Sequence, residues 1–330
     1  MKFVKDTVDQ QIVHYQQILA ERINAYTTAN PNSALYAPIG YMMELKAKRW
    51  RPMFLLACAE GYGASAERAM PAALAIEVFH NFTLMHDDIM DNAPLRRGQQ
   101  TVHEKWSTNT AILSGDAMIV QAYQLLADVD NDLLAPLMKV FNATALEVCE
   151  GQQMDMDFES RQDVHIDEYM EMIRLKTSVL LAAAVQMGAI CGNKSEEQQR
   201  LAYAFGEHFG LAFQLRDDYL DVFGDPNDFG KQEGGDILAD KKTFIYLHAC
   251  ETEGGNYKNE LLRWHGSHDP ISKIAGVKEI FRASGADDAC LKEIAIHSQA
   301  ASEALGRMEI APEAKTFFTA LLDIVQTRTV

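Results

Sequence analysis

Two short stretches of the chain carry the same acidic pattern, HDDIMD at residues 86–91 and RDDYLD at residues 216–221. In both, an apolar run is followed by aspartates at positions i, i+1 and i+4. Carboxylate oxygens are the ligands that Mg²⁺ prefers, and Mg²⁺ commonly joins one or two carboxylates to the phosphates of a substrate. The repeated pattern therefore predicts a single metal–phosphate site to which each stretch contributes one wall.

The aspartates of each stretch would be unfavourable in a helix that bound nothing. Asp87 and Asp91 are four residues apart, so on a helix they project about 40° apart from one face. Like charges at this spacing destabilise a helix, and at its C-terminal end they also oppose the macrodipole. One such motif is often only a solvated helix end, but two copies favour a cation site. His80 and Gln214 precede the two motifs on the same faces, although His80 could instead be a core histidine.

Basic residues are outnumbered in this chain, so the places where they gather are informative. They gather in LKAKRWRP, in PLRRG directly after the first acidic stretch, in IRLKTS, and in GKQEGGDILADKKT after the second. Arginine forks and lysine ammonium groups are the usual partners of diphosphates. Each cluster alone would be typical of a solvated surface. Their recurrence after both acidic stretches instead indicates a bound anion.

The bulk composition limits the class of protein. The 330 residues are 48% hydrophobic and carry a net charge of −17, which allows a buried core and repels nucleic acid and anionic membranes. Five cysteines without a CxxC spacing predict buried thiols in a reducing compartment. The N-terminus lacks the apolar region of a signal peptide, and the stretch SVLLAAAVQMGAICG is short for a membrane span. We therefore expect a cytoplasmic protein that has no transmembrane segment and binds no nucleic acid.

Helical periodicity dominates the chain, and strand patterns of period two are missing. Pro71 is expected in the first turn of the helix that carries the first motif, and Asn92, Ala93 and Pro94 are expected to stop that helix. No linker or solenoid repeat divides the chain, so we predict one all-α domain over residues 1–330. Helices are expected at Asp6–Thr27, Pro71–Asp91, Thr110–Ala127, Leu133–Asp157, Ile166–Ile190, Glu196–Phe223 and Lys242–Cys250.

Together, these residues resemble the trans-type (head-to-tail) isoprenyl diphosphate synthases, or polyprenyl synthetases. AKRWRP is similar to the family's GGKRxRP segment, and HNFTLMHDDIMD with PLRRG to its first aspartate-rich motif. GQQMD, KTS, QLRDDYLD and GKQEGGDILADKKT follow in the family's order, so the resemblance covers about Lys48 to Lys242. It implies the all-α isoprenoid-synthase fold, a single multi-helix bundle around a central cavity, and a homodimer. The chain departs from the family pattern at the uncharged positions Ala47, Gln100, Phe244 and Ile245.

The resemblance also implies a role for each matching residue. The expected Mg²⁺ ligands are Asp87, Asp88 and Asp91 on one side, and Asp217 on the other with Asp218, Asp221 and Asp236 in support. The expected partners of the allylic diphosphate are Arg96, Lys176, Lys231 and Lys241, with Thr177 and Gln214 lining the same site. Those of isopentenyl diphosphate are Lys48, Arg51, His80 and Arg97. Direct catalytic roles are expected for Asp87, Asp91, Asp217, Arg96, Lys176 and Lys231.

The implied reaction is a Mg²⁺-dependent condensation of isopentenyl diphosphate with an allylic diphosphate. Cations would stabilise the charge that grows on the leaving diphosphate, and the isopentenyl double bond would attack the allylic cation. In the family, residues four and five before the first aspartate often set product length. Here these are Thr83 and Phe82, with Phe79 a turn deeper. They predict a short-chain product, C20 ahead of C15, unless both phenylalanines are ordinary core residues.

Three other readings remain at this point. A terpene cyclase or head-to-head synthase would usually lack the second complete DDxxD, which is intact here. A non-catalytic regulatory subunit of the same fold would usually have lost aspartates, and none is lost. An acidic helical protein that merely binds divalent cations would leave the basic residues of the motifs unexplained.

Overall fold

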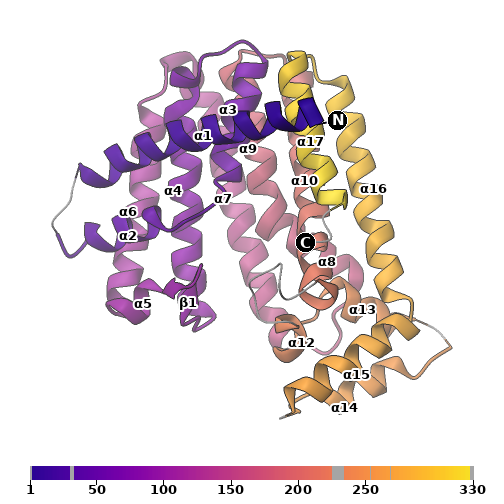
Figure 1. Cartoon of the computed structure of the whole chain (residues 1–330). Coiled ribbons are helices and arrows are strands. Elements are labelled where there is room, and N and C mark those ends of the chain that lie inside the picture. The colour runs from indigo at the N-terminus through magenta and orange to yellow at the C-terminus, as the bar shows by residue number, and fades with distance from the viewer. Residues whose placement is uncertain (1, 30–32, 225–233, 253, 268, 328–330) are drawn as a thin grey trace. The chain divides into compact units, whose positions relative to one another are not determined.

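The computed structural model describes residues 2–29, 33–224, 234–252, 254–267 and 269–327. This part of the chain is helical except for one two-stranded antiparallel hairpin (Figure 1). The expectation of a nearly pure helical chain is therefore confirmed. The residues group into two compact units. Unit 1 comprises residues 1–142, 183–203 and 308–317, and unit 2 comprises residues 143–182, 204–307 and 318–330. That the chain is a single domain stays a prediction.

Unit 1 carries the first aspartate motif at the end of α4, one of its long helices. Its complete elements are α1 (Lys2–Thr28), α2 (Tyr36–Glu44), α3 (Trp50–Gly61), α4 (Ala66–Met90), β1 (Leu95–Arg96), β2 (Gln99–Gln100), α5 (Val102–Lys105) and α6 (Thr108–Ala127). Four further helices have residues in both units, namely α7 (Asn131–Ser160), α9 (Val179–Cys191), α10 (Glu196–Phe223) and α17 (Pro312–Thr327).

The start of α4 corrects one expectation from the sequence. The helix begins at Ala66, and Pro71 lies inside it rather than in its first turn. Ser65 caps the helix, because its side chain accepts a hydrogen bond from the Arg68 backbone N–H. A serine at this position stabilises a helix start by about 1 kcal/mol. That stabilisation offsets part of the cost of the hydrogen bond that proline removes from a helix interior.

Close packing against α6 fixes the last turns of α4. A Cβ atom added to Gly115 of α6 would lie 2.2 Å from His86 Nε2, so only glycine leaves room for this ring. The same nitrogen lies 3.1 Å from the Ile112 carbonyl oxygen. His86 directly precedes the first two aspartates, and its fixed place therefore limits where their carboxylates can lie.

Unit 2 carries the second aspartate motif near the end of α10. Its complete elements are α8 (Ile166–Ile173), the π-helix η1 (Arg174–Ser178), α12 (Gly235–Leu238), α13 (Phe244–Glu251), α14 (Tyr257–Trp264), α15 (Pro270–Ala283) and α16 (Ala286–Arg307). Asp269 caps α15 by accepting a hydrogen bond from the Ser272 N–H.

Two glycines in unit 2 bring neighbouring helices into backbone contact with η1. A Cβ added to Gly151 of α7 would lie 2.3 Å from the Lys176 backbone nitrogen, and one added to Gly210 of α10 would lie 2.7 Å from the Ser178 Cα. Any side chain at either position would push the helices apart. Short π-helices occur mostly within α-helices and frequently at functional sites, and η1 carries Lys176 and Thr177.

The apolar stretch noted in the sequence belongs to a buried helix. Residues Ile166–Cys191 are long and apolar enough to cross a membrane by composition, but 78% of the most apolar window is buried inside the fold. The core helix of a folded domain has the same property, so this segment gives only weak support for a membrane span.

A histidine pair in unit 2 predicts how stability depends on pH. His208 Nδ1 and His297 Nδ1 are 3.0 Å apart, and burial together with His208 lowers the pKa of His297 to about 4. Because the folded pKa is depressed, this stability is complete above pH 6.5 and is lost as the pH falls toward 4. The loss is at most about 3 kcal/mol. We expect His297→Gln to be less sensitive than wild type to a shift from pH 7 to pH 5 in urea unfolding.

The matched control is His14→Gln, since His14 is an exposed histidine of unit 1. This variant should retain the pH dependence of the wild type. A His297→Gln protein whose stability falls between pH 7 and pH 5 as steeply as the wild type would contradict the assignment.

Candidate active site

The first aspartate motif ends α4 in a tight C-terminal cap. Asn92 adopts a left-handed conformation with φ 48°. Its N–H donates to the Ile89 carbonyl, and the Ala93 N–H donates to the Asp88 carbonyl. These two bonds form a Schellman motif, which satisfies the last carbonyls of a helix. The prediction that residues 92–94 stop this helix is therefore confirmed, and Asp91 is the cap residue itself.

The RRG sequence forms a hairpin that turns its first arginine back toward the motif. Leu95 pairs with Gln100 and Arg96 with Gln99. Arg97 and Gly98 form the turn, with φ values of 53° and 76°. Two positive φ values are the signature of a type I′ turn. This hairpin is the one sheet among the described residues, and no alternation in the sequence signalled it because each strand has only two residues.

Arg96 lies against the aspartates of the same motif. Its Nε donates to Asp88 Oδ1 at 2.8 Å, and its Nη2 lies 3.5 Å from Asp87 Oδ2. Asp88 is 1% exposed. Burial raises the pKa of Asp88, and Arg96 opposes that shift. Arg96 therefore holds Asp88 in this structure, whereas its predicted contact with a diphosphate stays a prediction.

Three of the residues expected to bind isopentenyl diphosphate, Arg51, His80 and Arg97, form a basic cluster in unit 1, in which Arg51 and His80 are partly buried and Arg97 is exposed. Arg51 Nη1 lies 3.1 Å from His80 Nε2. Because a guanidinium only donates, the His80 nitrogen accepts this bond and the ring is neutral. Burial and the nearby arginines, Arg51 first and then Arg97, hold the pKa of His80 well below its usual value. Burial also lowers the pKa of Arg51 to about 10. The fourth expected residue, Lys48, is exposed, and its Nζ lies 5.9 Å from the centroid of the Trp50 ring.

Arg51 also has an unused donor. Its Nε is buried and meets no hydrogen-bond acceptor within the described part of the chain. A buried charged donor without a partner is costly. A bound anion would satisfy it and would also neutralise the neighbouring cations.

Arg49 has a different role from the one its place in the basic run suggests. It forms an ion pair with Glu77 and donates to the carbonyls of Met43 and Leu45. Asn81 donates to the Glu77 carboxylate at 2.9 Å. Glu77 is 1% exposed, and a glutamate inside the apolar run of α4 was the sequence signal for this pair. The pair ties the basic loop to α4 one turn before His80.

The residues expected to set product length join an aromatic cluster in unit 1. Phe79 is fully buried, and its ring centroid lies 5.6 Å from Phe82 and 5.2 Å from Phe141 of α7. Phe82 also contacts His86. Thr83 is partly exposed and donates to the His80 carbonyl. Phe141 was missed in the sequence because it belongs to a different helix.

In unit 2, the second motif contains one aspartate that is enclosed by hydrogen bonds. Asp218 is 5% exposed. One of its oxygens accepts from Tyr169 of α8, and the other accepts from Gln214 Nε2 at 3.0 Å. Burial and the neighbouring Asp236 raise the pKa of Asp218 to about 8. Both oxygens are thus engaged, and the expected role of Asp218 as a Mg²⁺ ligand stays a prediction. Tyr169 carried no motif and was missed.

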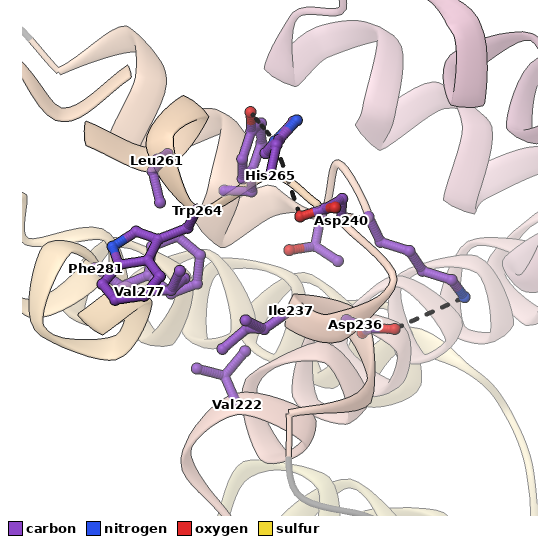
Figure 2. Close-up of a pocket in the computed structure, with 12 residues that line it drawn as sticks. Val222, Asp236, Ile237, Asp240, Leu261, Trp264, His265, Val277 and Phe281 are labelled. Carbon is purple, nitrogen blue, oxygen red and sulfur yellow. Dashed lines mark hydrogen bonds and ion pairs between the residues drawn. The ribbon is translucent and has the colours of Figure 1, made fainter. Parts of the chain in front are cut away.

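The remaining aspartates of this motif, Asp217 and Asp221, are partly exposed, and Asp221 contacts the start of α12. Asp221 Oδ2 accepts a hydrogen bond from the Asp236 backbone N–H at 2.8 Å. Lys241 Nζ lies 3.7 Å from Asp236 Oδ1. Figure 2 labels Asp236 and marks this ion pair with a dashed line. Asp217 lies one turn before Asp221 on the same helix, as predicted. The structure therefore groups Asp221, Asp236 and Lys241, while Lys231 lies outside the described residues.

Lys176 and Thr177 of η1 also contact residues of unit 2. Lys176 Nζ donates to Asp155 Oδ2 at 2.6 Å, and Thr177 donates to Gln214 Oε1 at 3.2 Å. Gln214 in turn bonds Asp218. The predicted Thr177 and Gln214 are therefore linked to the second motif by hydrogen bonds. Asp155, the last residue of GQQMD, anchors Lys176.

The donor groups fit Mg²⁺. Asp88 Oδ2 is buried and meets no donor within the described residues, so it is an oxygen with capacity for a cation. Among the residues that the structure describes, no three His, Cys, Asp or Glu side chains are grouped closely enough to enclose a metal. Mg²⁺ does not need such a cage, because it keeps several waters and binds one or two carboxylates plus substrate phosphates. Exposed carboxylates without sulfur or nitrogen donors suit this ion.

Comparisons with known proteins agree with this site. The chain is 42% identical to the geranylgeranyl diphosphate synthase of Methanosarcina mazei over 219 residues, which cover 66% of this chain and 68% of that protein. It is 37% identical to the geranylfarnesyl diphosphate synthase of Natronomonas pharaonis over 266 residues, which cover 74% and 77%. A solved geranylgeranyl pyrophosphate synthase superimposes with a TM-score of 0.90 at 48% identity, covering 94% of this chain and 98% of that one.

The likeness to the solved synthase confirms the predicted isoprenoid-synthase fold. The family model for polyprenyl synthetase matches residues 32–283, a range that contains both aspartate motifs and every basic residue assigned to the site. Since this match covers more than half of the chain, the chain belongs to the polyprenyl synthetase family of prenyl transferases.

Proposed function

We propose that the protein condenses isopentenyl diphosphate with an allylic diphosphate, head to tail, to give the C20 product geranylgeranyl diphosphate. The observation that carries this proposal is the basic cluster of Arg51, His80 and Arg97, in which the Arg51 Nε is buried and has no acceptor among the described residues. A terpene cyclase binds one diphosphate and would need one set of cations. This chain has the cluster in addition to Arg96, Lys176 and Lys241, which supports two diphosphate substrates.

The residues of unit 1 would hold isopentenyl diphosphate. Arg51 Nε would donate to the isopentenyl diphosphate, and Arg97 would lie beside it with Lys48. His80 would keep Arg51 in place, since its Nε2 already accepts a bond from that guanidinium. Positive groups fixed in a site of low dielectric stabilise bound phosphates more than mobile ones do.

The residues of unit 2 would hold the allylic diphosphate. Lys176, Lys241 and Lys231 would contact its oxygens, and Thr177 would line the site from η1. The chain's cations would stabilise the charge that develops as the allylic C–O bond breaks. The isopentenyl double bond then forms the new C–C bond, and the proton lost from the adjacent carbon would pass to the released diphosphate. His80 is poorly suited as the base, because its Nε2 lone pair is used by Arg51.

We further propose Mg²⁺ as the metal, with Asp87, Asp91 and Asp217 as its ligands and with Asp221 and Asp236 in support. When bound, Mg²⁺ supplies positive charge that makes diphosphate a better leaving group. Asp88 would orient Arg96, given its two contacts with that side chain.

A product assay tests this function. Purified protein would be incubated with Mg²⁺, labelled isopentenyl diphosphate and a C5, C10 or C15 allylic primer, and chain lengths would then be resolved. A discrete C20 product is expected from all three primers. No turnover with any primer, in a folded protein, would instead favour a regulatory subunit. A single cyclised product from the C15 primer alone would favour a cyclase.

The aromatic cluster of unit 1 predicts product length. Phe82 is partly exposed and packs against the buried Phe79, so we propose that it closes the floor under the growing chain. We expect Phe82→Ala to give products longer than C20 by one or more isoprene units, because the truncated side chain opens space. Phe82→Leu, which retains most of the volume, should shift the distribution less. An unchanged product spectrum in Phe82→Ala would show that Phe82 is only a core residue.

The proposed assembly is a homodimer. Ile112, Leu113, Val120 and Tyr123 of α6 are large apolar side chains that are exposed in the isolated chain. A group of this kind on a helix is typical of a protein–protein contact. Sedimentation equilibrium should therefore give twice the chain mass of 36.9 kDa.

We place the protein in the cytoplasm, which is consistent with its five free cysteines.

A further inference from the structure

The segment of residues 236–241 carries two residues of the candidate site, Asp236 and Lys241. Between them lies Asp240, which has no role in the proposed site but has a strained backbone. Asp240 adopts a left-handed backbone conformation with φ 52°. Non-glycine residues rarely do so, because the Cβ atom crowds the backbone at a cost of roughly 1–2 kcal/mol. Such strain persists where surrounding contacts determine the conformation. The contacts of the Asp240 side chain are therefore informative.

Both oxygens of the Asp240 carboxylate are held, one by α15 and the other by the turn that follows α14. Oδ1 accepts from Lys273 Nζ at 2.6 Å, and Oδ2 accepts from the Gly266 backbone N–H at 3.3 Å. His265 Nε2 lies 4.0 Å from Oδ1, and Figure 2 marks this contact between His265 and Asp240 with a dashed line. These contacts come from residues 25 or more positions away in the sequence, and they fix Asp240 in place.

Lys273 is the unusual member of this group because it is 2% exposed. Lysine is almost never fully buried unless it is paired. Its ammonium donates both to Asp240 and to the Leu238 carbonyl, at 3.3 Å. Leu238 is the last residue of α12, so Lys273 holds two points of a single short turn. Nothing in the catalytic roles proposed above uses this lysine.

The held turn presents its other groups to the second aspartate motif. The Asp236 N–H bonds the Asp221 carboxylate at 2.8 Å, and the Lys241 N–H bonds the Asp236 carbonyl at 3.0 Å. Asp236 and Lys241 thus lie at the two ends of a loop whose middle, from Leu238 to Asp240, is fastened by Lys273. A shift of the middle would move both ends.

We propose that Lys273 is a positioning residue: it binds Asp240 and the Leu238 carbonyl and thereby keeps Asp236 and Lys241 in place for the Mg²⁺-bound allylic diphosphate. The proposal rests on the function proposed above. It concerns the geometry of one substrate's site, so it predicts a selective effect on that substrate and on Mg²⁺.

The test compares Lys273→Met, which keeps the length of the side chain and removes its charge, with wild type. We expect the KM for the allylic diphosphate to rise about tenfold, while the KM for isopentenyl diphosphate changes less than twofold. Calorimetric titration with inorganic diphosphate and Mg²⁺ should show binding weakened by about tenfold. Asp240→Gly removes the anchored carboxylate and relieves the strain, so it should act like Lys273→Met. The double variant should be no worse than either single one.

Two controls separate positioning from general stability. Lys292→Met replaces an exposed lysine of α16 and should behave as wild type. Phe205→Leu alters a buried aromatic contact with Phe318, and it should lower Tm without separating the two KM values. Three results would overturn the proposal. The first is an unchanged allylic KM in Lys273→Met, and the second is an equal rise in both KM values. The third is a double variant in which the two increases in the allylic KM multiply. If Lys273→Met does not fold, Asp240→Gly decides: an allylic KM within twofold of wild type overturns it. If the wild type shows no turnover, the proposed function fails, and the diphosphate titration still tests the positioning.

Discussion

Replacing Asp87 with asparagine is expected to lower kcat by about 10³-fold while leaving Tm within 2 °C of wild type, a difference of at most roughly 1.4 kcal/mol. Asp87 lies at the C-terminal end of α4 and is 17% exposed at its side chain. Its carboxylate would provide a full negative charge for Mg²⁺, and an amide of the same shape provides none. Steady-state kinetics with a C15 primer and isopentenyl diphosphate, with thermal unfolding of the same sample, would measure both quantities.

Replacing the neighbouring aspartate, Asp88, should instead lower the stability of the fold. Asp88 is buried and holds Arg96, so we expect Asp88→Asn to destabilise the fold by about 1–3 kcal/mol through the weakened charged hydrogen bonds. Asp9→Asn, at an exposed position of α1, is the control that changes neither quantity. An Asp87→Asn enzyme that retained more than a tenth of the wild-type kcat would contradict the metal role of Asp87.

The long helices were predictable from the sequence because the 3.6-residue period is a local property. The expected Glu196–Phe223 is α10 to the residue, and the expected Thr110–Ala127 is α6 without its first two residues. The region Ile166–Ile190 was expected as one helix, but it contains the π-helix η1. Packing against Gly151 and Gly210 accompanies that interruption, and contacts between helices leave no periodic signal in one sequence.

The types of residue in the site were predictable, but their partners were not. Arg49 and Arg51 belong to the same basic run, yet one binds Glu77 and the other contacts His80. Arg49 is the N-cap residue of α3 and has a left-handed conformation with φ 55°, whereas Arg51 lies within the first turn of that helix. Tyr169 could not be assigned to Asp218 either, because the two residues come from separate helices and no motif joins them.

Replacing Glu77 with leucine is expected to lower the free energy of unfolding by about 3–5 kcal/mol, because Arg49 would be left buried and unpaired. The Arg49 side chain is 9% exposed and that of Glu77 is 2% exposed, so water cannot replace the lost partner. Arg49 also holds the loop next to Arg51. We therefore expect the KM for isopentenyl diphosphate to rise about tenfold, or roughly 1.4 kcal/mol, with a much smaller change in the KM for the allylic primer.

A double variant separates the lost charge from the lost packing. Glu77→Leu with Arg49→Met replaces the ion pair by apolar side chains, and such replacements are often neutral for stability. We expect this protein to unfold at a higher urea concentration than Glu77→Leu alone, yet to keep the raised KM for isopentenyl diphosphate, because the link between the basic loop and α4 is still missing. Glu67→Gln, an exposed glutamate of the same helix, is the matched control. A double variant with normal KM values would mean that Arg49 and Glu77 stabilise unit 1 without positioning Arg51.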